Sequence, residues 1–324
     1  MTVKASDLMK VYGPVPSRRL GQSLGINNIP PKICTYSCVY CQLGRTIRLH
    51  SERRTFYDPT VIASDAERQI RKARDRDERI DYLTIVPDGE PTLDVNLGRE
   101  ISLLKPLGIK IAVIENASLL WREDVRDDLS EADWVSLKVD AVTEDVWRKV
   151  NRPHSALRHE TVLQGMVDFA DMFKGVLATE TMLIHGLNDN VEEVEKIADF
   201  LATLRPSKAY IAIPTRPPAE SWVRPASEEA INRAYQIFDG KLDHVEYLIG
   251  YEGNAFAFTG NVEKDLLSIS SVHPMREEGV SGLLSKAGSD WSVVRKLLDE
   301  QRLIELEYGG NKFYMRRLPS RVAQ

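Results

Sequence analysis

Short apolar runs rich in β-branched residues alternate with longer amphipathic segments along about the first 250 residues of the chain. The short runs predict strands at residues 23–26, 82–86, 110–114, 134–139, 176–183, 209–213 and 245–249. The amphipathic segments predict helices at residues 59–76, 97–107, 122–129, 161–173, 191–204 and 227–238. Successive strand–helix steps of this kind favour an α/β fold whose parallel sheet closes partly into a (β/α)6, TIM-like barrel. The carboxyl ends of the strands then meet at one mouth.

The pattern changes after a glycine-rich stretch at residues 250–254. Helices are predicted at 274–286 and 289–301, followed by a hairpin with strands at 304–308 and 312–316. This order predicts a small winged helix-turn-helix-like domain over 263–324, after a barrel domain over 1–262.

Winged helices read nucleic acid, dock proteins or simply support a fold, and all three roles stay open. The best reader helix would be 289–301, which offers Trp291, Arg295 and Lys296. Acidic residues on the same segment dilute its positive charge: Asp290, Asp299 and Glu300.

Composition places the chain among ordinary soluble globular proteins. Its 324 residues are 43% hydrophobic, 28% charged and 7% aromatic. No apolar run approaches the roughly 18 residues that a membrane span needs. The first ten residues lack the continuous hydrophobic region of a secretory signal. We therefore expect a cytoplasmic protein with no membrane partner.

The net charge of −5 is unevenly distributed. Residues 1–80 carry 15 Lys and Arg against 8 Asp and Glu, so this part is basic and the remainder is acidic. Part of the basic excess follows the cysteines directly, at Arg45, Arg48, Arg53 and Arg54. Such a patch attracts phosphate or an acidic protein. For residues 68–79, where acids and bases alternate, a solvated helical face explains the charges equally well.

All three cysteines lie close together, at Cys34, Cys38 and Cys41. An odd, clustered set is no disulfide framework and fits a reducing compartment. The spacing C-x3-C-x2-C can hold three irons of a cubane and leave the fourth iron open. A structural zinc site would need a fourth ligand. A remote histidine could supply it, so zinc stays open as an alternative: His50, His154, His159, His185, His244 or His273.

A cysteine motif of this form, with an aromatic residue before the last cysteine and a strand before the first, resembles the radical S-adenosylmethionine (SAM) superfamily. The flanking segments 13–21 and 42–46 resemble its branch of wyosine tRNA-modifying-type Fe–S oxidoreductases. The resemblance covers residues 12–260. It implies a [4Fe–4S] cluster on Cys34, Cys38 and Cys41 whose open iron chelates SAM. One electron then cleaves SAM to methionine and a 5′-deoxyadenosyl radical that abstracts a substrate hydrogen.

Further motifs resemble the family's SAM-binding positions. Asp88-Gly89-Glu90-Pro91-Thr92 follows the second predicted strand and resembles the Gly-Gly-Glu motif, whose backbone and acid receive the methionine ammonium. An amine needs carbonyls and an anion, and glycine permits close backbone approach. Asp88 stands where the family has its first glycine. A simple tight turn is the alternative.

The resemblance places other SAM contacts on later strands. Asn116 lies where many relatives have Thr-Asn-Gly, and the backbone near Ile213 and Tyr40 would lie by the adenine. The strand period of two puts Ser136, Lys138 and Asp140 on one face. A lysine within an apolar strand is costly unless it meets an anion, and Lys138 matches a position that reaches the SAM carboxylate or ribose.

Candidate substrate contacts follow the strands at the mouth. Arg152 and His154 belong to an Asn-Arg-Pro-His stretch that resembles one common in this branch, although a helix-ending turn explains its Asn and Pro equally well. Arg216 suits an acidic or phosphate-bearing substrate, or is a buried structural arginine. The remaining candidates are Asp140, His185, Tyr251, Glu252 and Asn254.

The leading hypothesis is a radical SAM enzyme acting on a tRNA base, with a small molecule or cofactor precursor, or a protein side chain, as alternative substrates. Its electron would come from an acidic flavodoxin- or ferredoxin-type donor attracted by the basic segment. No second cysteine cluster is available for an auxiliary centre. The non-enzyme alternative is an Fe–S or zinc sensor whose winged helix binds DNA. That alternative leaves Gly89-Glu90-Pro91 and Lys138 unexplained.

Overall fold

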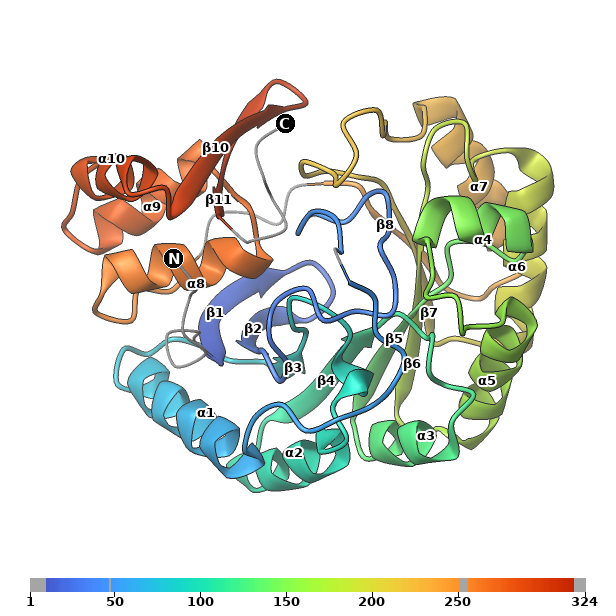
Figure 1. Cartoon of the computed structure of the whole chain (residues 1–324), viewed down its shortest axis with the longest axis horizontal. Helices are drawn as coiled ribbons and strands as arrows, with labels where there is room; N and C mark the ends of the chain where they lie inside the picture. The colour runs from blue at the N-terminus through green and yellow to red at the C-terminus, as the bar shows by residue number, and fades with distance from the viewer. Residues whose placement is uncertain (1–9, 47, 251–255, 318–324) are drawn as a thin grey trace.

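The computed structural model describes residues 10–46, 48–250 and 256–317. Eight strands form one sheet in sequence order, which curls into an open half-barrel (Figure 1). The first two strands pair antiparallel and the rest are parallel. They are β1 (Val11–Ser17), β2 (Gly21–Ile26), β3 (Tyr82–Ile85), β4 (Lys110–Glu115), β5 (Trp134–Lys138), β6 (Val176–Met182), β7 (Lys208–Ala212) and β8 (Val245–Leu248).

Helices cover the convex face of this sheet (Figure 1). They are α1 (Pro59–Arg74), α2 (Leu97–Leu104), α3 (Glu123–Ser130), α5 (His159–Met172), α6 (Val191–Leu204) and α7 (Glu228–Asp239), with α4 (Glu144–Asn151) after β5 and short 3-10 turns at Pro91–Leu93 and Lys105–Leu107. Alternate strand residues such as Leu83 and Val135 face the helices in the main core. Their neighbours, including Trp134, Ala178 and Tyr210, pack together on the concave face.

All seven predicted strands and all six predicted barrel helices are confirmed, with ends shifted by a few residues. Strand β1 and helices α4 and α8 lie outside the predicted ranges. The sequence of β1 contains two prolines and a glycine, which weaken a strand pattern. An edge strand with an irregular register tolerates them.

The residues after the barrel form a C-terminal unit, here residues 256–317. It contains α8 (Val262–Val272), β9 (Met275–Arg276), α9 (Glu277–Lys286), α10 (Ser292–Asp299), β10 (Leu303–Tyr308) and β11 (Asn311–Arg316). The predicted hairpin is confirmed as β10 and β11. The helix predicted from residue 274 begins at Glu277 because Met275 and Arg276 pair with β11 instead. This order of elements is the one a winged helix requires, and that assignment stays a prediction.

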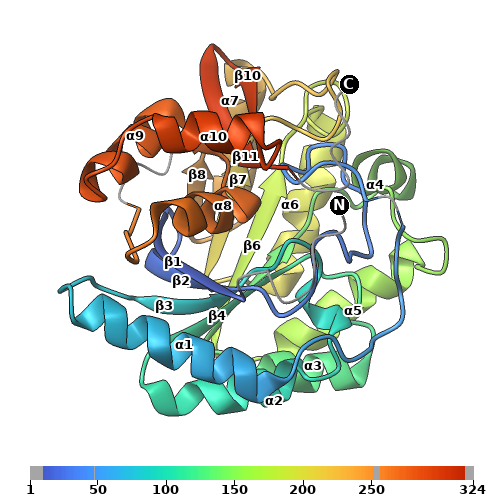
Figure 2. The same cartoon turned by 60° about the vertical axis from the view of Figure 1, so that its left-hand side comes forward.

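The C-terminal unit packs against the first hairpin of the barrel, and α8 lies beside β1 in both views (Figure 2). Tyr12 and Val15 of β1 share one buried apolar cluster with Leu266 and Ile269 of α8. The backbone of Ala257 donates to the Pro14 carbonyl at 3.1 Å. The apolar core therefore continues across the predicted boundary at residue 262, and the division into two domains stays a prediction.

No helix in the described part of the chain is long and apolar enough to cross a membrane.

Candidate active site

The three cysteines lie on the loop that leaves β2, and each sulfur faces an N–H donor. Asn116 Nδ2 is 3.7 Å from the Cys34 sulfur, and the Tyr36 backbone N–H also donates to that sulfur at 3.5 Å. Cys38 Sγ accepts from Asn151 Nδ2, and Cys41 Sγ from Lys32 Nζ, each at 3.5 Å. Donors of this kind stabilise negative charge on sulfur. The loop is therefore arranged for thiolates.

Burial opposes the thiolate form when nothing positive is bound. It raises the pKa of both Cys34 and Cys38 to about 12, and nearby acidic groups act in the same direction. Three gathered thiolates therefore need a cationic partner, which an iron cluster supplies. No three His, Cys, Asp or Glu side chains of the described ranges are grouped to hold a single metal ion. A cubane binds each cysteine through a separate iron and does not need that grouping.

The segment after β3 is joined directly to the cysteine loop. Lys32 N donates to the Asp88 carbonyl at 2.7 Å, and Glu90 N donates to the Ile33 carbonyl at 2.9 Å. A Cβ atom added at Gly89 would lie 2.0 Å from the Ile33 oxygen. Glycine is thus required here because two backbones approach closely. The sequence motif predicted close approach to SAM, whereas the contact observed is to the cysteine loop.

Glu90 lies at the centre of this contact and is almost completely buried. Its carboxylate accepts from Thr92 N at 3.0 Å and from Asn116 N at 2.9 Å. Burial raises the pKa of Glu90 to about 7, and the pKa of neighbouring Glu115 is also raised, first by burial and then by Glu90. Glu115 Oε1 is buried without a hydrogen-bond partner among the described residues. An ammonium group bound beside these two buried acids would stabilise their ionised forms.

Lys138 points into the concave side of the sheet and meets acids of the chain itself. Its ammonium lies 2.9 Å from Glu180 Oε1, 3.6 Å from Asp140 Oδ1 and 4.9 Å from the centre of the Tyr40 ring. Glu180 also pairs with Arg19. Burial lowers the pKa of Lys138. The anion that a buried lysine requires is therefore already present in the protein.

Asp140 is predicted as a substrate contact, but in the structure its oxygens are engaged within the chain. Its side chain is fully buried and accepts from Met182 N at 2.9 Å, from Asn151 Nδ2 at 2.8 Å and from the Tyr40 hydroxyl. Ser136 faces the same side, and its hydroxyl is buried without a partner in the described part of the chain. Ser136 is thus free to make a hydrogen bond to a bound ligand, whereas Asp140 is not.

Three more of the predicted residues lie on segments that follow β5 or β6. Arg152 follows the last residue of α4 in a left-handed conformation, and it pairs with Glu220. The local structure of this stretch is therefore a helix-ending turn, which is the alternative to substrate binding that the sequence predicts. His154 Nδ1 accepts from Ala156 N, and the His185 side chain is 66% exposed and pairs with Asp189.

Two further predictions concern the loop after β7 and the segment after β8. Ile213 is half-buried, and Arg216 donates to Gln42 Oε1 at 2.7 Å and lies 3.0 Å from His273 Nδ1. Arg216 therefore joins the cysteine loop to the C-terminal unit. The last three candidates, Tyr251, Glu252 and Asn254, lie outside the described residues.

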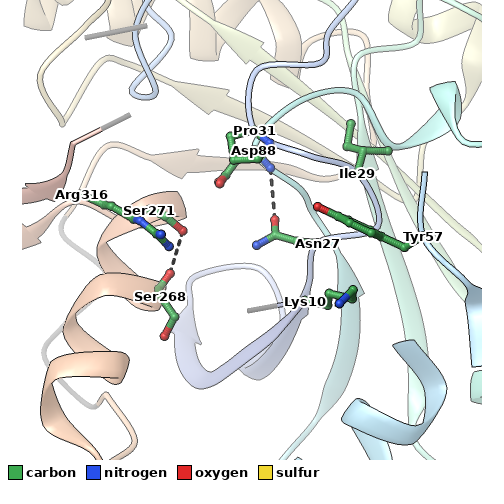
Figure 3. Close-up of a pocket in the computed structure, with 9 residues that line it drawn as sticks. All are labelled: Lys10, Asn27, Ile29, Pro31, Tyr57, Asp88, Ser268, Ser271 and Arg316. Carbon is green, nitrogen blue, oxygen red and sulfur yellow. Dashed lines mark hydrogen bonds between the residues drawn. The ribbon is translucent and has the colours of Figure 1, made fainter. Parts of the chain in front are cut away.

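Asp88 faces a pocket between the barrel and the C-terminal unit (Figure 3). Its backbone N–H donates to Asn27 Oδ1 at 3.2 Å, while its Oδ1 atom is buried and lacks a partner among the residues described. Burial raises the pKa of Asp88 to about 6 despite the opposing effect of Arg316. The wall across the pocket comes from the C-terminal unit: Ser268, Ser271 and Arg316.

Sequence reasoning missed several residues that the fold brings to this site. They include Lys32, which meets the Cys41 sulfur, and Glu180, which meets Lys138 from the neighbouring strand. Glu180 carried a usable signal, because it is an acid on the alternate face of a predicted strand. The sequence offers no comparable pattern for Lys32, whereas Asn151 stands in the Asn-Arg-Pro-His stretch already singled out.

The model of the radical SAM superfamily matches residues 28–201, more than half of the chain. The chain belongs to the radical SAM superfamily. UPF0026 protein MJ1312 of Methanocaldococcus jannaschii is 49% identical over 96% of this chain and 97% of its own length. A radical SAM methyltransferase from Sphaerobacter thermophilus has a similar fold, with TM-score 0.52 and 15% identity over 70% of this chain and 66% of that one. Streptococcus suis SuiB bound to S-adenosylmethionine also has a similar fold, with TM-score 0.51 and 15% identity over 70% of this chain and 51% of that one.

Membership decides between the hypotheses of enzyme and regulator. The protein is a radical SAM enzyme, and its cofactors are a [4Fe–4S] cluster and SAM. A zinc site on the cysteines and a non-enzymatic sensor are thereby set aside. The narrower resemblance to wyosine-type enzymes stays a prediction.

Proposed function

We propose that Cys34, Cys38 and Cys41 ligate the cluster and that Glu90, with the backbone of residues 88–91, receives the ammonium of SAM. The observation that carries this is the pair of backbone hydrogen bonds joining the Gly-Glu segment to the cysteine loop. The two motifs form one site although they lie about fifty residues apart. When bound and supplied with one electron, the cluster and SAM yield a 5′-deoxyadenosyl radical that abstracts hydrogen from the substrate.

The protein's own side chains and backbone would bind and orient SAM. Glu90, ionised above its raised pKa, would hold the ammonium, while the Ser136 hydroxyl and the Ile213 backbone would contact the rest of SAM. Tyr40 is fixed by its hydrogen bond to Asp140 and lines the same side. The ion pair with Glu180 neutralises the charge of Lys138 inside the concave face of the sheet.

For the substrate, we propose a small molecule or cofactor precursor in place of the tRNA base expected from the sequence. The Tyr308 hydroxyl donates to the Pro214 carbonyl at 3.0 Å, so the C-terminal unit contacts the rim after β7. Two residues of the expected RNA-reading helix are engaged within the unit. The Trp291 ring packs 5.4 Å from that of Tyr314, and Lys296 lies 2.9 Å from Glu263. A tRNA base and a protein side chain remain the alternative substrates.

We propose that the acidic electron donor, of flavodoxin or ferredoxin type, docks beside the cysteine loop. Arg45 and Arg152 are 55% and 41% exposed and share the buried Glu220, whose backbone N–H donates to the Val39 carbonyl at 3.1 Å. Trp222 is 50% exposed two residues beyond Glu220. Positive charge with an exposed aromatic residue suits an acidic protein partner.

The test of the function is direct. Protein reconstituted anaerobically with iron and sulfide is incubated with SAM and dithionite, and 5′-deoxyadenosine is measured. We expect product from the wild type and none from Cys38→Ala. A fully loaded wild-type cluster that yields no 5′-deoxyadenosine refutes the proposal.

The substrate class is tested separately. Metabolites and tRNA from a strain lacking this gene are compared by mass spectrometry with those of the parent. Binding of tRNA is also measured at two salt concentrations, because several phosphate contacts give a steep salt dependence. A missing tRNA modification together with salt-sensitive binding would replace the small-molecule substrate by a tRNA base.

A further inference from the structure

The end of α4 runs antiparallel to the cysteine loop. Val39 N donates to the Val150 carbonyl at 2.9 Å, and Ser37 N donates to the Asn151 carbonyl at 3.0 Å. Farther along, His154 N donates to the Thr35 carbonyl at 2.8 Å. Residues 150–154 therefore hold the segment that contains Cys38 along its length. The two segments lie more than one hundred residues apart in the sequence, so only the tertiary fold brings them together.

Side chains reinforce this contact. Trp147 Nε1 donates to the Tyr36 hydroxyl at 3.1 Å, and the two rings meet edge to face. Arg152 adopts a φ of 46°, which ends the helix and turns the chain along the cysteine loop. The position of Asn151 relative to Cys38 is thus fixed by the backbone on both sides.

The Asn151 side chain is directed at the Cys38 sulfur. Its Nδ2 atom lies 3.5 Å from Cys38 Sγ and 2.8 Å from Asp140 Oδ2, so its two N–H groups have two different acceptors. Asp140 is held in turn by the Met182 backbone and the Tyr40 hydroxyl. The flipped amide would place its oxygen against a carboxylate and a sulfur, so this orientation is strongly preferred.

We propose that Asn151 is a positioning residue that holds an N–H on the Cys38 sulfur and thereby raises the reduction potential of the cluster. The inference rests on the proposed ligation by Cys38. Reduction places more negative charge on the cluster and its ligand sulfurs, so an N–H donor stabilises the reduced form more than the oxidised form. This assigns the Asn-Arg-Pro-His stretch to the cluster rather than to the substrate.

The test is a redox titration of the reconstituted cluster, followed by electron paramagnetic resonance of its reduced form. Asn151→Leu removes the donor at similar volume, and Asn151→Ala removes it with a smaller side chain that adds no new donor. Asn232→Leu is the control, because Asn232 lies on α7 and contacts Tyr247. We expect both Asn151 variants to bind iron like the wild type and to show a more negative midpoint potential, with the control unchanged.

An unchanged potential in the loaded Asn151 variants overturns the proposal. So does loss of iron by both variants with their fold intact, which would make Asn151 a residue needed for assembly. Failure of the proposed function looks different. In that case Cys38→Ala retains the same iron content and spectrum as the wild type.

Discussion

At the scale of single residues, burial shifts the protonation of several acids of the barrel. Glu90, Glu100 and Glu115 are each at most 3% exposed. Burial raises the pKa of Glu90 to about 7 and that of Glu100 to about 9. Both values lie near or above neutral pH, so these acids make testable contributions to binding and to stability.

The first prediction concerns SAM binding by Glu90. As pH rises through about 7, Glu90 loses its proton and becomes the anion that an ammonium group needs. We expect SAM affinity of the loaded protein to increase between pH 6 and pH 8. Glu90→Gln should bind roughly tenfold more weakly at pH 8 and show a flatter pH profile. Equilibrium binding under anaerobic conditions measures both, and an equal pH slope in the variant contradicts the assignment.

The second prediction concerns Glu100, whose carboxyl group is completely buried. Because its folded pKa of about 9 exceeds the unfolded value of 4.5, its stabilisation is complete below about pH 4.5 and declines as pH rises toward 9. Glu100→Gln removes that decline. We expect the variant to be more stable than the wild type by a few kcal/mol at pH 8. Urea unfolding at pH 8 and pH 5 should show the difference shrinking at the lower pH.

At the scale of elements, the site depends on contacts between loops rather than on any one helix or strand. The sequence correctly predicts β3, the Gly-Glu segment after it and the cysteine loop. It does not indicate that the Asp88 and Ile33 carbonyls accept hydrogen bonds across these two loops. Hydrogen bonds between distant loops leave no periodic signal, because neither partner repeats along the chain.

The third prediction tests this loop contact. In Gly89→Ala, the new Cβ would meet the Ile33 carbonyl oxygen at 2.0 Å, so one loop must move. We expect a loss of about 1–3 kcal/mol in stability and a clear loss of bound iron after reconstitution. Gly240→Ala is the control, because its Cβ would lie 3.4 Å from the nearest atom. Equal iron binding by the two variants would contradict the importance of the contact.

At the scale of the whole molecule, the C-terminal unit and the barrel share a core and both border the site. Tyr12 of the barrel and Ile269 of α8 lie in the same apolar cluster, and Arg216 contacts His273 across the junction. Tyr12 fits because Gly25 beneath it has no side chain, where a Cβ would lie 2.1 Å from the ring. We therefore expect the two parts to unfold together.

The fourth prediction is that Ile269→Ala destabilises both parts. Ile269 is 1% exposed, so the cavity should cost about 2–5 kcal/mol. Hydrogen exchange followed by mass spectrometry should show faster exchange in β1 as well as in α8. Ile249→Ala is the matched control, because Ile249 is 40% exposed. A change confined to residues 256–317 would show that the unit folds independently.

The sequence alone determined that the three cysteines are clustered, and it predicted the strands and the segments that follow them, since cysteine spacing and local periodicity carry that information. Tertiary structure decided which side chains contact one another. It placed Glu180 and Asp140 beside Lys138, directed Asn151 at Cys38 and turned Asp88 toward the C-terminal unit. The physical reason is that hydropathy patterns record which face of an element is buried. Which buried polar groups meet depends on how the sheet curls and how its loops cross.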